Sequence, residues 1–515
     1  MARAAQRCLC YNGVNAYPAT ANIPRKGVHA VPDQPNLLFI MADQLRHDFL
    51  SCYGASFIQT PHIDALAQQG VRFGRAFSEH PVCVPARVSL LTGMHALKTG
   101  VTDNGLFLRP DHRACGIATW PELLSAQGYY TAAIGKMHFY PWDLRLGFQY
   151  RRIAEDKRWI HIRDDYYHYL HVHGLRKYHG NEHEGYFEHQ GAIVNRLPWE
   201  YQVDHFVGLE ACHFIRAHGT EGPFAMMVGF PGPHCPYDPA PEFLQAFDPA
   251  DMPEPAPDAG DTPKLREGNI RGNRQPWNGV DISEFTREQK LRVRAHYAAL
   301  VAQIDYEVGQ IVGALREQGL LDNTVILFSS DHGDYLGDHN LIGKGHFFEA
   351  SWHVPVLARL PGATSGTVRD DLVVLTDVTA TLLALAGMDV PAHMDARPLP
   401  GLGLPGAEQG RDHLIGALGG GWAIQQGPWR LAKYSTGEAT LFQMDQDPLE
   451  QRNLIDDPGC RGIYRELDAR LTSAIMHGMA ESHFAQRVYV RDLSQTDDFG
   501  REGWQRPYPR PITEQ

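Results

Sequence analysis

The amino-acid sequence predicts an α/β fold in which helices flank a mostly parallel central sheet, with a smaller C-terminal antiparallel α+β subdomain. Short apolar runs alternate with longer amphipathic stretches from residue 35 to about residue 410, as in proteins whose strands and helices alternate. After about residue 410, short strand-like runs follow one another across a glycine-containing turn. We therefore expect a larger domain at 35–410 and the subdomain at 411–483.

The first predicted strand is the apolar run NLLFIMADQ at 36–44, which ends in an Asp-Gln pair. A helix is predicted at 60–70, with Thr60 as N-cap, Pro61 as its first residue and Gly70 just past its end. A second helix is expected to begin with PARVSLLTG, directly after Cys83.

Further along the chain, buried strands are predicted at 129–135 and 224–230, with an amphipathic helix between them at 204–219. A long helix over 286–318 precedes a strand at 324–331. Another strand at 354–361 and a helix at 377–387 complete the larger domain. In the subdomain, strands are expected within 421–435 and 439–455.

Composition and charge exclude several classes of protein. The chain has 515 residues, 43% hydrophobic and 21% charged, which is ordinary for a soluble globular protein. No apolar run approaches the length of about 18 residues that a membrane span needs, and the net charge of −13 argues against nucleic acid as the main partner. The eight cysteines are too scattered for a disulfide framework.

The two ends of the chain are predicted to lie outside the folded body. Residues 1–34 have no continuous apolar segment, so we expect a mobile leader rather than a secretory signal, and a cytoplasmic protein. The tail at 484–515 is rich in proline, arginine and aromatic residues, and we expect it to be disordered or to contact a second subunit in a homo-oligomer.

Polar residues follow four of the predicted strands, and sites in parallel sheets form beyond the carboxyl ends of strands. Asp43 and Gln44 follow the first strand, and Asp331 and His332 end the strand at 324–331. Three oxygens and one imidazole suit a divalent cation, with Ca²⁺ or Mg²⁺ favoured and Mn²⁺ an alternative. The competing interpretation is that each aspartate only caps a loop or a helix.

A set of cationic residues also follows strands or lies in glycine-rich loops: Arg87, Lys136, His138, His234 and Lys344. Such a cluster can hold a tetrahedral oxyanion and stabilise the charge that develops on it and on a leaving oxygen. The alternative for any one of them is a solvated surface group. Cys83, read alone, is compatible with a buried thiol, a thiolate nucleophile or a precursor of another group.

The order of these motifs resembles the type I sulfatase family of the alkaline-phosphatase-like superfamily. Cys83-x-Pro85-x-Arg87 followed by LLTG is similar to the sulfatase signature. The other matching blocks are the Asp-Gln strand end, GKMH, PHCPY, DHGD with GDH and GK, and LFQMDQDPLEQRNL, so the resemblance covers roughly residues 36–456. It implies an α/β hydrolase that cleaves the sulfate monoester of a small organic alcohol or phenol.

The resemblance also implies roles for individual residues. Cys83 would be oxidised by a formylglycine-generating enzyme, and a hydroxyl of the hydrated aldehyde would be the nucleophile. Asp43, Gln44, Asp331 and His332 would bind the cation together with residue 83, Ca²⁺ being usual and Mn²⁺ an alternative. Arg87 would support the aldehyde hydrate, and His138 would hold and deprotonate it. Lys136, His234 and Lys344 would bind the sulfate or help the leaving oxygen depart. Asn104 would bind the substrate near its oxyanion.

One departure keeps other functions open. Gln44 stands where many sulfatases have a second aspartate, and relatives that hydrolyse phosphonate monoesters and phosphodiesters share the Asp-Gln and Asp-His pairs. The intact GKMH block favours a sulfatase. A catalytically silent anion- or metal-binding protein is the alternative if residue 83 stays a cysteine.

The segment at 140–203 is rich in aromatic residues and histidines. Either it is an insertion that packs on the body of the protein, or it is a lid or wall that shapes the substrate pocket.

Overall fold

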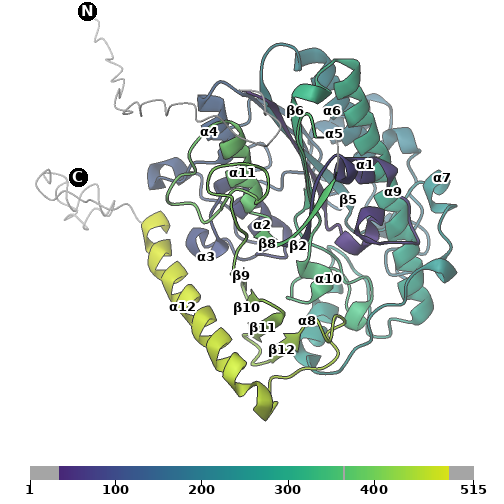
Figure 1. The fold of residues 1–515 in the computed structure, drawn as a ribbon. Helices are drawn as coiled ribbons and strands as arrows, with labels where there is room; N and C mark the ends of the chain where they lie inside the picture. Colours follow the sequence, from purple (N-terminus) through teal and green to yellow (C-terminus); the bar gives the residue numbers. More distant parts are fainter. Residues whose placement is uncertain (1–33, 364–365, 487–515) are drawn as a thin grey trace, which may run out of the picture.

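A computed structural model describes residues 34–363 and 366–486 of the chain. Its main sheet has the strand order β4-β3-β5-β1-β6-β7-β2-β8 (Figure 1). The strands are β1 Asn36–Asp43, β2 Gly70–Phe77, β3 Tyr130–Gly135, β4 Tyr150–Ile153, β5 Phe224–Pro233, β6 Thr324–Ser330, β7 Val356–Arg359 and β8 Thr367–Val374. Only β7 runs antiparallel to its neighbours, so the prediction of a mostly parallel sheet is confirmed.

Helices cover both faces of this sheet because its central strands are apolar on both sides. In β1, Leu38 and Ile40 belong to the core under α1 Pro61–Gln68, α6 Val203–His218 and α9 Arg287–Glu317. The alternate residues Leu37 and Phe39 belong to the core under α2 Cys83–Thr92, α4 Trp120–Ala126 and α11 Asp377–Leu385. Successive side chains of a strand point to opposite faces, so one apolar run supplies two cores.

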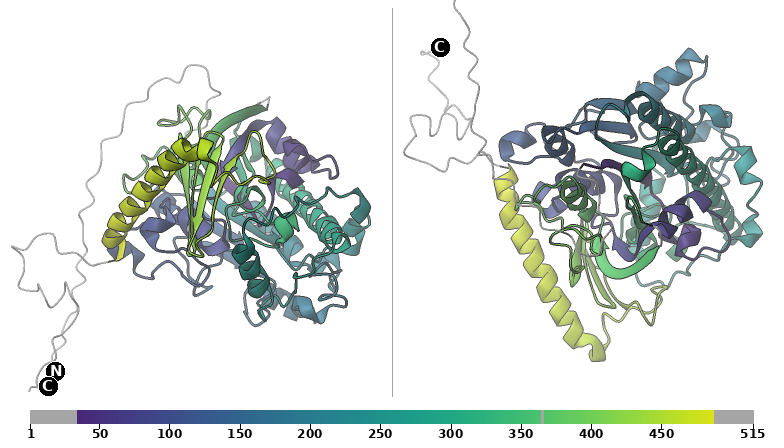
Figure 2. Two further views of the ribbon diagram at one scale, coloured as in Figure 1. Left: turned by 90° about the horizontal axis from the view of Figure 1, so that it is seen from below. Right: turned by 45° about the horizontal axis from the view of Figure 1, so that its top comes forward.

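The second sheet is antiparallel, with the order β12-β11-β10-β9. Its strands are β9 His413–Leu418, β10 Gly421–Gln426, β11 Trp429–Tyr434 and β12 Ala439–Gln443. The long helix α12 Arg461–Gln486 lies along it (Figures 1 and 2) and packs Leu467 and Leu471 against Ile424, Leu431 and Leu441. The predicted smaller antiparallel part is therefore present; the exact domain boundaries stay predictions.

The remaining helices are short or lie on the long connections between strands. They are α3 Ala96–Thr99, α5 Asp165–Val172, α7 Pro241–Leu244, α8 Pro263–Asn273 and α10 Glu349–Trp352. Among the described residues, no helix combines the length and the apolar character needed to cross a membrane. The expected leader, apart from residue 34, and most of the expected tail fall outside the described residues; the cytoplasmic location and the oligomer contact stay predictions.

Two local predictions are confirmed and a third is wrong. Thr60 occupies the N-cap of α1 as predicted, although its hydroxyl bonds to Ser51 and Asp64 and makes no capping bond to the helix. Gly70 lies just past the end of α1 as predicted and is the first residue of β2. The expected strand at 439–455 stops at Gln443, because the Asp447 carboxylate accepts bonds from the following backbone N–H groups and closes a turn.

Candidate active site

Four neighbouring strands bring the predicted site residues to one edge of the sheet. Asp43 ends β1, Lys136 follows β3, His234 follows β5 and Asp331 follows β6. Since β3, β5, β1 and β6 are adjacent in that order, their carboxyl ends lie side by side. The juxtaposition anticipated from the sequence is therefore present in the fold.

Cys83 lies at the start of α2, deep in the protein. Its side chain is 1% exposed, and its Sγ lies 3.2 Å from His332 Nε2 and 3.8 Å from Asp43 Oδ1. Burial raises the pKa of this thiol, but Lys344, Lys136 and His332 outweigh it and bring that pKa well below its usual range. The environment of residue 83 is thus built to stabilise negative charge.

Arg87 lies one turn further along α2 and fixes two carboxylates. Its Nη2 donates to Asp43 Oδ2 at 2.7 Å and its Nε to Asp331 Oδ2 at 2.9 Å, while Nη1 donates to the carbonyl of Lys136 at 2.7 Å. The guanidinium is 1% exposed, so these charge-assisted bonds form out of contact with water. They hold one oxygen of each aspartate away from the site.

Asp43, Cys83, Asp331 and His332 form a possible metal-binding group, since one ligand atom from each lies within 4.8 Å of the others. Burial and Cys83 would raise the pKa of Asp43, but Lys136, His234 and Arg87 hold it well below its usual value. His332 Nδ1 donates to the carbonyl of Gly333 at 2.9 Å, which leaves Nε2 as the free ligand atom.

Gln44 lies beside this group, and its backbone N–H donates to Asp331 Oδ1 at 2.9 Å. Its Nε2 donates to Asp334, which orients Oε1 toward the site, where it accepts from Lys344 Nζ at 2.6 Å. The residue has φ +69°, and the hydroxyl of Tyr297 donates to its carbonyl at 2.6 Å. The left-handed conformation is therefore held by a buried tyrosine, which sequence reasoning did not single out.

The cationic residues surround the same position. Lys136 Nζ lies 3.0 Å from Asp43 Oδ2, and Lys344 Nζ lies 2.7 Å from His234 Nε2. Burial, Lys344 and Arg158 lower the pKa of His234 to about 3, so the imidazole is neutral. A hydrogen bond from His138 is among the contacts that lower the pKa of Cys83, after burial and its cationic neighbours. Asn104 Oδ1 accepts from the Val84 backbone N–H at 2.9 Å and so caps α2.

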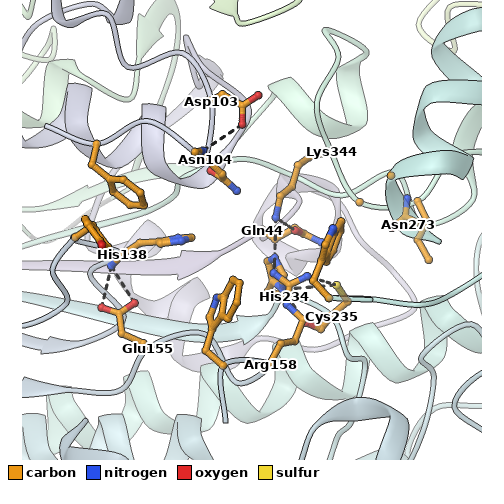
Figure 3. Close-up of a pocket in the computed structure, with 18 of the residues that line it drawn as sticks. Gln44, Asp103, Asn104, His138, Glu155, Arg158, His234, Cys235, Asn273 and Lys344 are labelled. Carbon is orange, nitrogen blue, oxygen red and sulfur yellow. Dashed lines mark hydrogen bonds between the residues drawn. The ribbon is translucent and has the colours of Figure 1, made fainter. Parts of the chain in front are cut away.

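We call the buried charged set Asp43, Arg87, Lys136, Asp331 and His332 the floor. Gln44 and His234, which lie next to the floor residues Asp331 and Asp43, line a cavity of about 770 Å³ (Figure 3). We call the aromatic residues that line this cavity the wall: Phe107, Phe139, Tyr140, Trp142, Trp159 and Trp277. Three of them come from the segment at 140–203, which also supplies strand β4 to the main sheet.

Several residues of the site were missed from the sequence. Asp334 lies within the DHGD block and could have been found there; it accepts bonds from Gln44, from the Tyr237 hydroxyl at 2.7 Å and from the Gly343 N–H at 2.8 Å. Asp156 and Arg158 lie in an irregular, charge-rich stretch, where no pattern marks them. Asn269 lies on α8, whose polar sequence gave no signal.

A second group of potential ligands, His47, Glu349 and His353, lies elsewhere among the described residues. Its two imidazole rings stack with centroids 3.6 Å apart and planes at 21°. Lone pairs in nearly parallel planes do not converge on one ion. Glu349 also forms a salt bridge with Arg430, so this group fits a structural role.

The comparisons with known proteins agree with this geometry. The family described as Sulfatase matches residues 35–388. The chain is 30% identical over 454 residues to an arylsulfatase of Clostridium perfringens, covering 82% of this chain and 90% of the relative. It is 31% identical over 454 residues to a choline-sulfatase of Rhizobium meliloti, covering 82% and 83%.

Among solved structures, a phosphonate monoester hydrolase of Agrobacterium radiobacter has a TM-score of 0.74 at 24% identity, covering 86% of this chain and 96% of that chain. This likeness shows the shared fold alone. The fold, the site and the matched family together define a hydrolytic enzyme. Within that class, the chain belongs to the sulfatase family and is a sulfuric ester hydrolase.

Proposed function

We propose that the chain hydrolyses the sulfate monoester of a small organic alcohol or phenol, using a formylglycine made from Cys83 and a divalent cation. One observation carries this proposal: buried carboxylates, Cys83 and cationic side chains converge at the ends of four adjacent strands. Such a site can activate an oxygen nucleophile and neutralise the three sulfuryl oxygens together.

Asp43, Gln44, Asp331 and His332 fit a divalent cation, with residue 83 completing the set. The position of Gln44 supports this assignment, because Asp334 directs its amide oxygen to Lys344 at the cavity while its backbone N–H donates to Asp331. A mostly oxygen ligand set favours Ca²⁺, and the imidazole keeps Mn²⁺ as the alternative. When bound, the cation would lower the pKa of an oxygen nucleophile and offset charge on the sulfuryl group.

The remaining side chains would act on the nucleophile and on the substrate. Arg87 holds Asp43 and Asp331 and lies one helical turn from residue 83, where it can support a hydrated aldehyde. His138, whose side chain bonds to Cys83, would take a proton from that hydrate. Lys136, Lys344 and Asn104 can donate to sulfuryl oxygens, and His234 can join them once it carries a proton on Nε2.

Aromatic groups in the wall support a small aromatic or cationic alcohol as the leaving group. The cavity of about 770 Å³ falls within the range of small-molecule sites. Aromatic faces can stack on an aryl ring or hold a quaternary ammonium group. The arylsulfatase and choline-sulfatase relatives are named for substrates of these two kinds.

The test begins with mass spectrometry of the peptide that contains residue 83, where conversion to formylglycine lowers the mass by about 18 Da. Steady-state kinetics on aryl sulfate, choline sulfate, sugar sulfates and a phosphonate monoester then rank the substrates. We expect a sulfate ester to be preferred and activity lost to a chelator to return with Ca²⁺ or Mn²⁺. A phosphonate preference above all sulfates would favour the phosphonate/phosphodiester alternative, and an unmodified, inactive protein would favour the silent binding protein.

A further inference from the structure

Arg158 lies in the segment 140–203 and lines the cavity beside His234 and Lys344 (Figure 3). Its Nε donates to Asp156 Oδ1 at 2.9 Å and its Nη2 to Asp156 Oδ2 at 2.8 Å. The guanidinium carbon lies 4.8 Å from the centre of the Trp277 ring. The side chain is 11% exposed, so the guanidinium is held in one place at the inner end of the wall.

Asp156 connects Arg158 to the floor. Lys136 Nζ lies 3.2 Å from Asp156 Oδ2 and 3.0 Å from Asp43 Oδ2, and all three side chains are 0–1% exposed. Charges of alternating sign therefore run from Asp43 through Lys136 and Asp156 to Arg158. Two side chains of the 140–203 segment thus belong to the same buried charge network as the possible metal ligands.

His234 cannot satisfy both cations that approach it. Its Nδ1 donates to the carbonyl of Cys235 at 2.7 Å, so Nε2 is the acceptor and has one lone pair. Lys344 Nζ lies 2.7 Å from this nitrogen and Arg158 Nη2 lies 3.3 Å from it. Lysine and arginine only donate, so two donors compete for one acceptor at the cavity.

The other terminal nitrogen of Arg158 is also weakly bonded. Nη1 donates to Cys235 Sγ at 3.8 Å, and a thiol sulfur is a poor acceptor. The protein therefore supplies fewer strong acceptors than Arg158 and Lys344 have donors facing the cavity. A bound group with several anionic oxygens would supply them.

We propose that Arg158 binds the sulfuryl group of the substrate, donating to sulfuryl oxygens beside Lys344 and His234. The inference rests on the proposed function, because it places the sulfuryl group at the Cys83 end of the cavity. A guanidinium presents donors in a fixed fork that matches an oxyanion, and Asp156 fixes the direction of that fork. Arg158 is thus a substrate-binding residue supplied by the 140–203 segment.

The test measures binding of inorganic sulfate by titration calorimetry, and kcat/KM for an aryl sulfate, in the metal-loaded enzyme and in Arg158→Gln. We expect the sulfate Kd to rise at least about 10-fold and kcat/KM to fall about 10²–10³-fold, as for loss of one oxyanion donor. Arg158→Lys keeps a positive charge next to Asp156 and preserves folding, and we expect an intermediate loss because the fork is gone.

The matched control is Arg152→Gln in the same segment, where the side chain is 48% exposed and pairs with Asp165 and Glu210. It should leave the sulfate Kd and kcat/KM unchanged. A sulfate Kd within about 2-fold of wild type in both Arg158 variants would overturn the proposal, whatever happens to KM. If sulfate binding depends on Arg158 while no sulfate ester is hydrolysed, the proposed function fails and the assignment of Arg158 as an oxyanion ligand stands.

Discussion

The charged side chains of the floor are 0–1% exposed, whereas three aromatic side chains of the wall are much more open: Tyr140 is 66%, Trp277 42% and Trp159 39% exposed. The floor residues lie at or next to the ends of strands, and a hydrophobic core packs against each face of these strands. The wall residues lie on connections outside the sheet. The contrast indicates that the reaction at the sulfuryl group depends on the buried floor. The selection of the alcohol depends on the more exposed wall, where substitutions are better tolerated.

The largest effect is expected from breaking the floor with Lys136→Met. The change leaves Asp43 and Asp156 buried with less compensating charge, so we expect a loss of about 3–5 kcal/mol in the free energy of unfolding. It also removes a proposed sulfuryl donor, so kcat should fall about 10²–10³-fold. Urea unfolding and steady-state kinetics measure the two effects.

Lys433→Met is the control for that change, because Lys433 is 43% exposed and pairs with Asp468 on α12. It should cost less than about 1 kcal/mol and leave kcat unchanged. If Lys136→Met and Lys433→Met lowered the free energy of unfolding and kcat equally, the buried charges of the floor would be no more important than an exposed ion pair.

A smaller effect is expected from replacing Asn269 of α8, which lies between the floor and the wall. Its Nδ2 donates to the carbonyl of Ile342 at 2.9 Å and its Oδ1 accepts from the Ile342 N–H at 3.2 Å, so it holds the loop that carries Lys344. Asn269→Ala should lower kcat roughly 10-fold, because it would let Lys344 shift from its position at the site. Small displacements of a group that acts on the substrate reduce the reaction rate steeply. KM should change less than kcat.

Asn273→Ala on the same helix serves as the comparison, since Asn273 bonds within its own neighbourhood, to Asn269 and Asn278. It should leave kcat near the wild-type value. If Asn269→Ala changed KM alone, Asn269 would act by contacting the substrate and not by holding the loop that carries Lys344.

The wall is tested most directly by Tyr140→Ala. Tyr140 packs against Phe107 with ring centroids 5.0 Å apart at the open side of the cavity. Loss of one aromatic contact should raise KM for an aryl sulfate about 3–10-fold and leave kcat and inorganic sulfate binding unchanged. Phe187→Ala, which removes a 56% exposed ring of the same segment outside the cavity, should change neither constant.

The smallest effect concerns pH, through Glu155, which lines the cavity next to the floor. Burial raises the pKa of this carboxyl, which accepts from the His138 backbone N–H at 3.1 Å. A carboxyl with a raised folded-state pKa contributes stability below its unfolded pKa, and this contribution is lost as pH rises through the folded pKa. In Glu155→Gln, urea unfolding should therefore show a smaller fall in stability from acidic to neutral pH; an unchanged pH dependence would contradict the prediction.

The strand ends could be predicted because their signal is local. The apolar runs of β1, β5 and β6 are continuous, and Asp43, His234 and Asp331 come directly after them or at their ends. The edge strand β8 and its neighbour β2 were missed because their sequences, TVRDDLVV and GVRFGRAF, place charged residues among apolar ones. Such strands are half covered, so no continuous apolar run marks them.

The supporting contacts could not be predicted, because they join residues far apart in sequence. Tyr297 on α9 supports Gln44 from 253 positions away, and Asn269 holds a loop 73 positions further along. Nothing in the local sequence of Arg158 indicates that it approaches His234, since that approach depends on how the 140–203 segment folds back over the sheet. Such contacts follow from tertiary packing, which local pattern does not encode.

The burial of Cys83 determines whether modification of this residue comes before or after folding. The thiol is 1% exposed and contacts Asp43 and His332, and its helix is buried along its whole length. A second protein cannot reach it once the sheet and α2 have assembled. If formylglycine is the working group, its synthesis must precede folding, and a chain that folds first is committed to remaining inactive.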